Sequence, residues 1–339
     1  MFGPFTAGDS LRVYRLQRKG VSLDLQRYLT QPVTPLREAW LAFLTQQAMG
    51  QPTYVLYDLY DGEGFIQVRY RPHQAAVDVA FLAPALEESS QAASAWFHLL
   101  DGACVETAGR GIQRVFANVP DSGAEADVFH QAGFMLYAGE DLYRLDRPPA
   151  TQLDAKAPPL RAQRPEDWPS VQKLCVAITP QRVRQTEGGI TVAAGEEKDC
   201  QRYVLPGEDG EDPIAALTFC SGGQAHWLRV LVHPEARDLT NGLVRWAVTA
   251  LAGQSSRPIY CNVRQYESGV RVALEAAGFE LYATRSLMVK HTVAWSKAPA
   301  PDLAKALAGS AEIAPPAYHI NGEAELKAPK GRLASTREP

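Results

Sequence analysis

The chain has 339 residues, of which 46% are hydrophobic and 21% charged, as in folded proteins with room for two domains of ordinary size. Its net charge of −4 at pH 7 offers no positive field for a nucleic acid backbone or an anionic membrane surface. No segment approaches the roughly 20 apolar residues that span a bilayer, and the N-terminus lacks an export signal. We therefore expect neither a nucleic acid partner nor membrane insertion.

The cysteines do not indicate a disulfide framework, and the histidines do not indicate a metal site. Five cysteines are scattered without a Cys-x-x-Cys pair, and their odd number argues against a closed disulfide framework. A reducing, cytoplasmic location is therefore expected. The seven histidines show no metal-ligand spacing, so no metal is predicted.

An internal repeat organises the chain. Two strand-like segments and two Gly-Phe corners recur in the same order: VFANV at 115–119 and IYCNV at 259–263, then QAGFMLYA at 131–138 and AAGFELYA at 276–283. The repeated residues lie 144 or 145 positions apart. Matched order at a near-constant offset predicts two copies of one alternating strand and helix plan.

The first copy is expected over residues 1–147. Additional helical material is predicted around 36–47, before the repeated strands and helices begin. A polar stretch bounded by prolines, 148–159, is predicted to be the linker.

The second copy is expected over residues 160–294, where Asp167 is a plausible helix cap. Its predicted elements are a strand at 160–164, a helix opening at 165–168, strands at 202–205, 214–219 and 226–232, a helix at 242–251, a strand at 258–263, a helix at 268–277 and a strand at 279–290. The segment 295–339, rich in alanine, proline and charge, is expected to be a largely disordered tail with one short helix near 303–308.

The segment 230–243, VLVHPEARDLTNGL, carries the most specific motif. It resembles the acyl-CoA-binding signature of the GNAT acyltransferase superfamily, in which a strand ending in V-x-P leads to Arg/Gln-x-x-Gly-x-Gly/Ala at a helix start. Arg237 matches the first position and Gly242 the last, while Thr240 stands where the family usually has glycine. Residues 160–167 and 274–279 resemble the family's opening strand and helix and its closing Gly-Phe corner.

The resemblance implies a fold and a function. The fold is α+β or α/β, with two tandem GNAT-like domains, each a mixed, mostly antiparallel sheet flanked by helices. The implied function is an acyl-CoA-dependent N-acyltransferase that transfers an acyl group, with acetyl-CoA as the expected donor, to an amine acceptor through a tetrahedral intermediate. The alternative is a non-catalytic acyl-CoA-binding or interaction protein derived from the same fold. Neither reading fixes the acceptor or the oligomeric state.

The predicted cofactor site lies at the start of a helix, where unpaired backbone N–H groups and the positive dipole end suit a pyrophosphate. Its predicted residues are Val230, Val232, Arg237, Asp238, Leu239, Thr240, Asn241, Gly242 and Asn262. The corresponding stretch of the first copy has no arginine or glycine but has Glu87 and Glu88, which would repel an anion. We therefore expect a degenerate first copy and one acyl-CoA site, in the second.

The acid and base are harder to assign. The strand at 226–232 carries no carboxylate, which leaves His226 as its titratable base, with a water relay, bulk solvent or Asp78 of the first copy as alternatives. Leu274 occupies the position where the family often has an acidic tyrosine, so Tyr266 is the candidate replacement. Packing roles remain open for both His226 and Tyr266.

Overall fold

A computed structural model of the chain describes residues 1–32, 34–58, 62–148, 158–188, 200–207 and 212–292. All of them fall in one compact unit, Met1–Val293. Most of the expected linker and the whole expected tail, with its short helix, lie outside the described residues.

The first half follows the repeated plan after an N-terminal helical extension. Its elements are β1 (Phe2–Pro4), η1 (Ala7–Asp9), α1 (Ser10–Leu16), η2 (Gln17–Lys19), β2 (Val21–Ser22), α2 (Leu25–Thr30), α3 (Pro35–Leu44), β3 (Thr53–Asp58), β4 (Gly62–Tyr70), β5 (Ala76–Ala83), η3 (Leu86–Glu88), α4 (Ala92–Ala108), β6 (Arg114–Pro120), α5 (Ala124–Gln131) and β7 (Met135–Leu145). Helix α3 is the helical material predicted around 36–47.

The second half contains every predicted strand and helix, with ends shifted by a few residues, and one helix, α7, that was not predicted. Its elements are β8 (Arg161–Ala162), η4 (Pro165–Asp167), α6 (Trp168–Ile178), α7 (Gln181–Glu187), β9 (Cys200–Pro206), β10 (Pro213–Ser221), β11 (His226–Val232), η5 (Pro234–Leu239), α8 (Thr240–Ala252), β12 (Ile259–Arg264), α9 (Ser268–Ala276) and β13 (Glu280–His291). Gly278 follows α9 with φ of +88°, a left-handed conformation that glycine adopts without steric penalty.

One sheet joins the strands of both halves, in the order β1-β3-β4-β5-β6-β13-β7-β12-β11-β10-β9-β8, with β2 beside β5. Helices cover both faces of it. Along β10, Leu217 and Phe219 point into the core beneath α8, whereas Ala216 packs beneath α6 on the other face. This alternation is the period of a strand that is buried on both sides.

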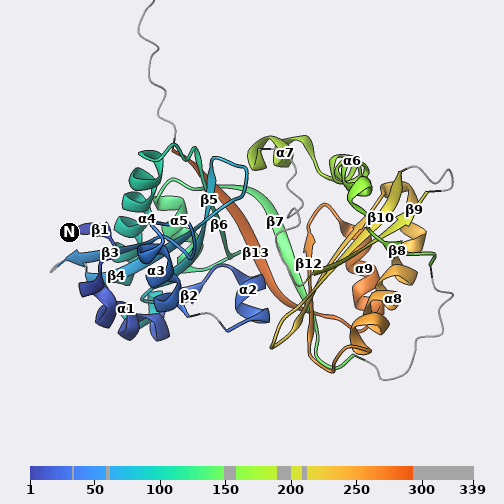
Figure 1. Cartoon of the computed structure of the whole chain (residues 1–339), viewed down its shortest axis with the longest axis horizontal. Helices are drawn as coiled ribbons and strands as arrows, with labels where there is room; N and C mark the ends of the chain where they lie inside the picture. Colours follow the sequence, from blue (N-terminus) through green and yellow to red (C-terminus); the bar gives the residue numbers. More distant parts are fainter. Residues whose placement is uncertain (33, 59–61, 149–157, 189–199, 208–211, 293–339) are drawn as a thin grey trace, which may run out of the picture. The chain divides into compact units, whose positions relative to one another are not determined.

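The last strand of each half completes the sheet of the other half. β13 pairs with β6 of the first half, β7 pairs with β12 of the second, and β7 and β13 pair with each other between them (Figure 1). Glu140 of β7 and Arg285 of β13 lie directly opposite each other at the centre of this exchange. Because both copies share one sheet, the predicted boundary between domains 1–147 and 160–294 stays a prediction.

The cysteine prediction is wrong at one place. Cys200 and Cys220 stand opposite each other on β9 and β10 and form a disulfide, with Cα atoms 4.2 Å apart. Strand register brings them together, and spacing along the chain does not reveal register. Cys104, Cys175 and Cys261 are free and buried.

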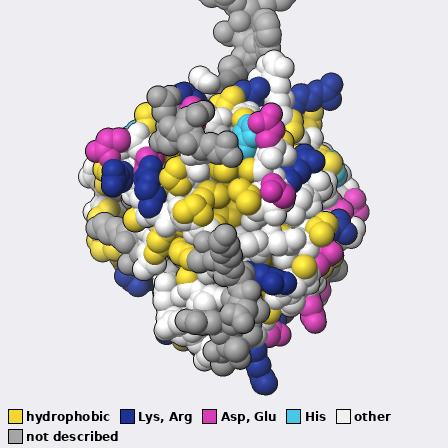
Figure 2. Space-filling model, turned by 90° about the vertical axis from the view of Figure 1, so that its right-hand side faces the viewer, with side chains coloured by type: hydrophobic (Ala, Val, Ile, Leu, Met, Phe, Trp, Pro, Cys, Tyr) yellow, Lys and Arg dark blue, Asp and Glu magenta, His cyan; other side chains and the backbone are white. Residues whose placement is uncertain are grey.

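One face of the molecule shows side chains of mixed character. In Figure 2, hydrophobic side chains gather near the centre of the view, and positive and negative side chains are interspersed around them. That face has no uniform sign of charge. Among the helices of the described residues, none combines the length and apolarity that a membrane crossing requires.

Candidate functional site

Two pairs of parallel strands separate towards their carboxyl ends. β11 and β12 pair only over residues 226–228 and 259–261, and β5 and β6 pair only over 76–78 and 114–116. Gaps beyond the carboxyl ends of parallel strands are common ligand sites in α/β sheets. We call them the first gap, between β5 and β6, and the second gap, between β11 and β12.

The first gap is filled by the chain itself. β2 pairs antiparallel with Phe81 and Leu82 of β5, and the backbone N–H of Leu23 donates to the carbonyl of Ala80 at 2.9 Å. Gly20 permits the approach, because a Cβ there would lie 2.7 Å from the carbonyl oxygen of Leu82. The edge of β5 that would face a ligand is therefore already hydrogen-bonded.

The second gap is open at its mouth. No strand of the described residues pairs with 229–232 of β11 on the side that faces β12. A cavity of about 100 Å³ lies there, between the starts of α8 and α9. It is lined by Ile178, Val232, Pro234, Arg237, Thr240, Tyr266, Glu267, Ser268, Gly269 and Val270. We call it the mouth cavity.

Three of the predicted cofactor residues line the mouth cavity: Val232, Arg237 and Thr240. Thr240 is 2% exposed, and its hydroxyl has no hydrogen-bond partner. A buried hydroxyl without a partner is costly, so its position beside a cavity favours a ligand with a polar group at this point. The backbone N–H of Thr240 is already used, since it donates to the carbonyl of Arg237.

The remaining residues of the motif lie around the mouth cavity without lining it. Val230 is buried beneath α8, and Asp238, Leu239 and Asn241 are exposed on η5 and the first turn of α8. A side chain added at Gly242 would meet no other atom within 4 Å. Gly242 therefore faces open space beside the helix start.

An ion pair between the partly exposed Arg229 and the buried Glu267 lies at the inner end of the second gap. Arg229 of β11 donates to both carboxylate oxygens of Glu267, at 2.8 and 2.6 Å, and to the backbone carbonyl of Asn262 at 2.9 Å. Glu267 also accepts from the backbone N–H of Arg264 at 3.0 Å. Sequence reasoning missed this carboxylate, because it reaches the strand from the loop before α9. Its oxygens are therefore largely occupied by donors of the chain itself.

The structure does not bring the two predicted acid–base residues together. Tyr266 lines the mouth cavity, and burial raises the pKa of its phenol, which keeps it protonated at neutral pH. His226 lies at the opposite end of β11, about 20 Å away along a seven-residue strand. There it is 1% exposed, and its ring nitrogens contact the hydroxyls of Ser221 and Ser255 at 2.9 and 2.7 Å. Burial, followed by the nearby Arg257, lowers the pKa of His226.

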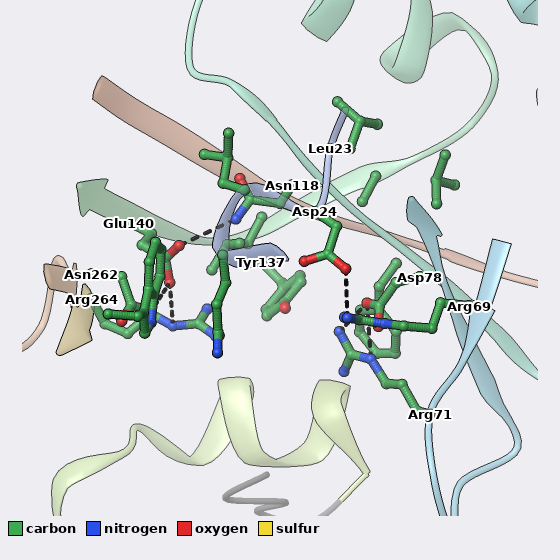
Figure 3. Close-up of a pocket in the computed structure, with 17 residues that line it drawn as sticks. Leu23, Asp24, Arg69, Arg71, Asp78, Asn118, Tyr137, Glu140, Asn262 and Arg264 are labelled. Atoms are coloured by element: carbon green, nitrogen blue, oxygen red, sulfur yellow. Dashed lines mark hydrogen bonds and ion pairs between the residues drawn. The ribbon is translucent and has the colours of Figure 1, made fainter. Parts of the chain in front are cut away.

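A second cavity, of about 220 Å³, lies over the exchanged strands. We call it the central cavity. Figure 3 shows two charged groups facing it from opposite sides, with Tyr137 between them. Asp24, Arg69, Arg71 and Asp78 form one group, and Asn118, Glu140, Asn262 and Arg264 form the other.

The first charged group is internally paired. Arg69 contacts Asp24 at 2.6 Å and Asp78 at 3.4 Å, and Arg71 contacts Asp78 at 2.6 Å. Burial alone would raise the pKa of Asp78, but Arg71 and Arg69 beside it hold that pKa below its usual range. Asp78, the alternative base, is therefore a paired carboxylate at neutral pH.

The second charged group is centred on Glu140. The side-chain amides of Asn118 and Asn262 donate to its two oxygens at 3.2 and 3.1 Å, and the Arg264 Nε lies 3.2 Å from it. Asn262, predicted to bind the cofactor, thus lines the central cavity and not the mouth cavity. The two repeated asparagines share one partner at the centre of the exchange. In the described part of the chain, no cluster of His, Cys, Asp or Glu is placed to hold a metal ion.

Solved structures share this fold. A GCN5-related N-acetyltransferase from Sphaerobacter thermophilus matches with a TM-score of 0.56 and 14% identity, over 87% of this chain and 96% of that chain. A tandem GNAT protein from the clavulanic acid biosynthesis pathway matches with a TM-score of 0.51 and 13% identity, over 87% of this chain and 99% of that chain. No family model matches the sequence, and no curated protein matches it significantly. The chain therefore has the tandem GNAT fold, and the prediction of that fold is confirmed.

Proposed function

We propose that the protein is an acyl-CoA-dependent N-acyltransferase that binds one acyl-CoA, with acetyl-CoA as the expected donor, in the second gap. The observation that carries the proposal is the contrast between the gaps: one is filled by the chain, and the other is open beside Arg237 and an unpartnered Thr240 hydroxyl. Two solved structures that share the fold of this chain are a GCN5-related N-acetyltransferase and a tandem GNAT protein, which supports the same chemistry here.

The first gap indicates how the CoA arm would lie in the second. β2 and Leu23 run along the free edge of β5 as an extended chain, with backbone hydrogen bonds to Ala80, Phe81 and Leu82. The pantetheine arm carries two amide groups and is of similar width. It would lie in the same way along 229–232 of β11 and pass Tyr266 in the mouth cavity, with the pyrophosphate outside that cavity at the start of α8 and near Arg237.

The reaction needs an attacking amine and a protonated leaving group. The neutral amine nitrogen forms a bond to the thioester carbon, the C–S bond breaks, and the amine proton leaves to water in the central cavity. Tyr266 donates its proton to the departing CoA thiolate and recovers it from solvent. The phenol is protonated at neutral pH, as a proton donor must be. His226 has no part in this scheme because of its distance from the mouth cavity.

Titration calorimetry with acetyl-CoA tests the site. We expect one molecule bound per chain. Gly269→Glu places a carboxylate in the mouth cavity at the second residue of α9, where α5 of the first half already has Glu125. Like-charge repulsion of the pyrophosphate should weaken binding by at least about 100-fold, while an acid in a first helical turn does not disturb the fold.

Ala124→Glu, at the exposed first residue of α5, is the matched control and should bind acetyl-CoA like the parent. Two molecules bound per chain, or unchanged binding by Gly269→Glu, would refute the assignment of the site to the second gap.

A non-catalytic acyl-CoA-binding protein is the second candidate. It is favoured by one observation: Glu267, Asp78 and Glu140, the carboxylates nearest the second gap and the central cavity, are all held by arginines. Release of free CoA thiol in the presence of a broad panel of amines separates the two. Tight acetyl-CoA binding without any release would establish the second candidate.

A further inference from the structure

Asn262 and Asn118 occupy equivalent positions but differ in what their side-chain oxygens contact. In both, the amide nitrogen must face Glu140, because only the nitrogen can donate to a carboxylate. The Asn118 oxygen then accepts from Arg285 Nε at 2.9 Å. The Asn262 oxygen is buried and has no partner. The exchange places Glu140 against both asparagines but Arg285 against only one.

Arg264 has an unpartnered donor in the same place. Its Nε contacts Glu140 at 3.2 Å and its Nη2 contacts Glu187 at 3.3 Å, whereas its Nη1 is buried without a partner. A buried cationic donor left unpaired is costly, and an anionic oxygen is the partner that best satisfies it.

The two side chains that carry these atoms lie on one wall of the central cavity. Residues 262 and 264 are two apart on β12, so both side chains leave the same face of the strand, and both line the cavity (Figure 3). On the opposite wall, Arg69 and Arg71 are engaged by Asp24 and Asp78. The β12 wall therefore contains one neutral acceptor and one cationic donor that make no hydrogen bond within the described chain.

We infer that the central cavity binds the acyl acceptor and that this acceptor is a small amino acid, with its carboxylate on Arg264 Nη1 and its amine N–H on the Asn262 oxygen. This inference rests on the proposed function and names its substrate class. A volume of about 220 Å³ admits an amino acid of modest side chain.

The arrangement suits a nucleophilic amine. The Asn262 amide oxygen can accept from a neutral amine, and the Glu140 carboxylate beside it is already engaged by Asn118, Asn262 and Arg264. The bound amine attacks the thioester carbon, the C–S bond breaks, and the amine proton passes to water. The products are an N-acyl amino acid, in which the amide is neutral and the carboxylate is retained, and CoA thiol.

The test compares three acceptors that share one side chain: an α-amino acid, its carboxamide and its decarboxylated amine. Release of CoA thiol from acetyl-CoA gives kcat and KM for each with the full-length chain. The parent should prefer the amino acid over both analogues by at least about tenfold in kcat/KM, because a charge-assisted hydrogen bond is lost with each analogue.

Arg264→Lys keeps the positive charge beside Glu140 and Glu187 but removes the forked donor. We expect the preference for the carboxylate to fall to less than about threefold, mainly through a higher KM. Arg285→Lys is the control, because Arg285 lies opposite Glu140 on β13 and donates to Asn118 but does not line the central cavity. It should keep the preference of the parent, and thermal unfolding of both variants reports any loss of fold.

Equal or better use of the decarboxylated amine by the parent would overturn this inference and leave the proposed function standing. Retention of the full preference by Arg264→Lys would also overturn it. Acetyl-CoA binding with no release from any of the three acceptors would refute the inference together with the enzymatic part of the proposed function.

Discussion

The two gaps in the sheet show how one fold position serves stability in one copy and chemistry in the other. In the first gap, Leu23 is 2% exposed and packs into the apolar core beneath α4 and α5. At the inner end of the second gap, the corresponding residues are the buried Glu267 and its partner Arg229, whose side chain is 23% exposed. A gap that is only structural is closed with an apolar side chain. A gap that keeps an ion pair and an empty mouth has given up stability that an apolar filling would supply.

The largest expected change in the free energy of unfolding comes from breaking the ion pair of the second gap. Glu267→Leu should reduce the free energy of unfolding by about 3–5 kcal/mol, because Arg229 is left without its partner. The double variant R229M/E267L removes both charges and should be more stable than the single variant. Chemical denaturation measures both. If the double variant were as unstable as the single one, the Arg229–Glu267 pair would itself stabilise the fold. The two gaps would then not differ in stability in the way that Leu23 and the ion pair suggest.

The next effect concerns the filling of the first gap. Leu23→Ala should cost about 2–4 kcal/mol in urea denaturation, since it leaves a cavity in the core. Ser268→Ala, at the open mouth of the second gap, should cost less than about 0.5 kcal/mol. Acetyl-CoA affinity should be unchanged in Leu23→Ala. A new binding event in that variant would show that the first copy keeps a latent cofactor site.

A smaller effect is expected at Gly242. Gly242→Glu adds a negative charge to the first turn of α8, near the proposed pyrophosphate position but outside the lining of the mouth cavity. Acetyl-CoA affinity should fall about tenfold, less than in Gly269→Glu, because the side chain can turn into open space. Gly253→Glu at the other end of α8 is the control and should bind normally. Equal loss in both glutamate variants of α8 would indicate a general effect of charge.

The smallest expected effect is on the pH dependence of stability and concerns His226, at the end of β11 that pairs with β12. The pKa of His226 is lowered in the folded state, so the unfolded chain takes up its proton first as the pH falls. The stability supported by the neutral ring is therefore present above the unfolded pKa of about 6.5 and decreases as the pH falls below it. His226→Gln should flatten this part of the stability profile between pH 7.5 and 5.5, while acyl transfer changes less than about twofold. A tenfold loss of rate would return His226 to the catalytic scheme.

The sequence predicts the elements of the second copy well, because each has a clear period and a Gly or Pro boundary. It does not predict β2, which is two residues long and too short to show a period. It also does not predict the exchange of β7 and β13, since either strand pattern fits either neighbour. These two features decide which gap is open and where the central cavity lies.

Some site residues could be predicted from the sequence and others could not. Arg237 and Thr240 were found because they belong to a continuous motif, whereas Glu267 and Arg264 act across elements that meet only in the fold. One signal was present for the ion pair: Arg229 is the single residue of fixed charge in the otherwise apolar strand HWLRVLV, and such a residue needs a buried partner. Its spacing does not say which acidic residue supplies that partner.

Because β7 and β13 are exchanged, the sheet of each copy needs a strand from the other copy. Deleting the first copy would take β7 from beside β12 and expose an unpaired edge in the copy that carries the open gap. Glu87 and Glu88 lie on η3, the segment of the first copy that corresponds to the motif around Arg237 and Gly242, and the second copy needs β7 whatever that segment does. The same dependence acts during synthesis on the ribosome: the outer edge of β6 has no partner until β13 has been made. Chaperones that shield strand edges should matter more for this chain than for a protein whose two copies fold one after the other.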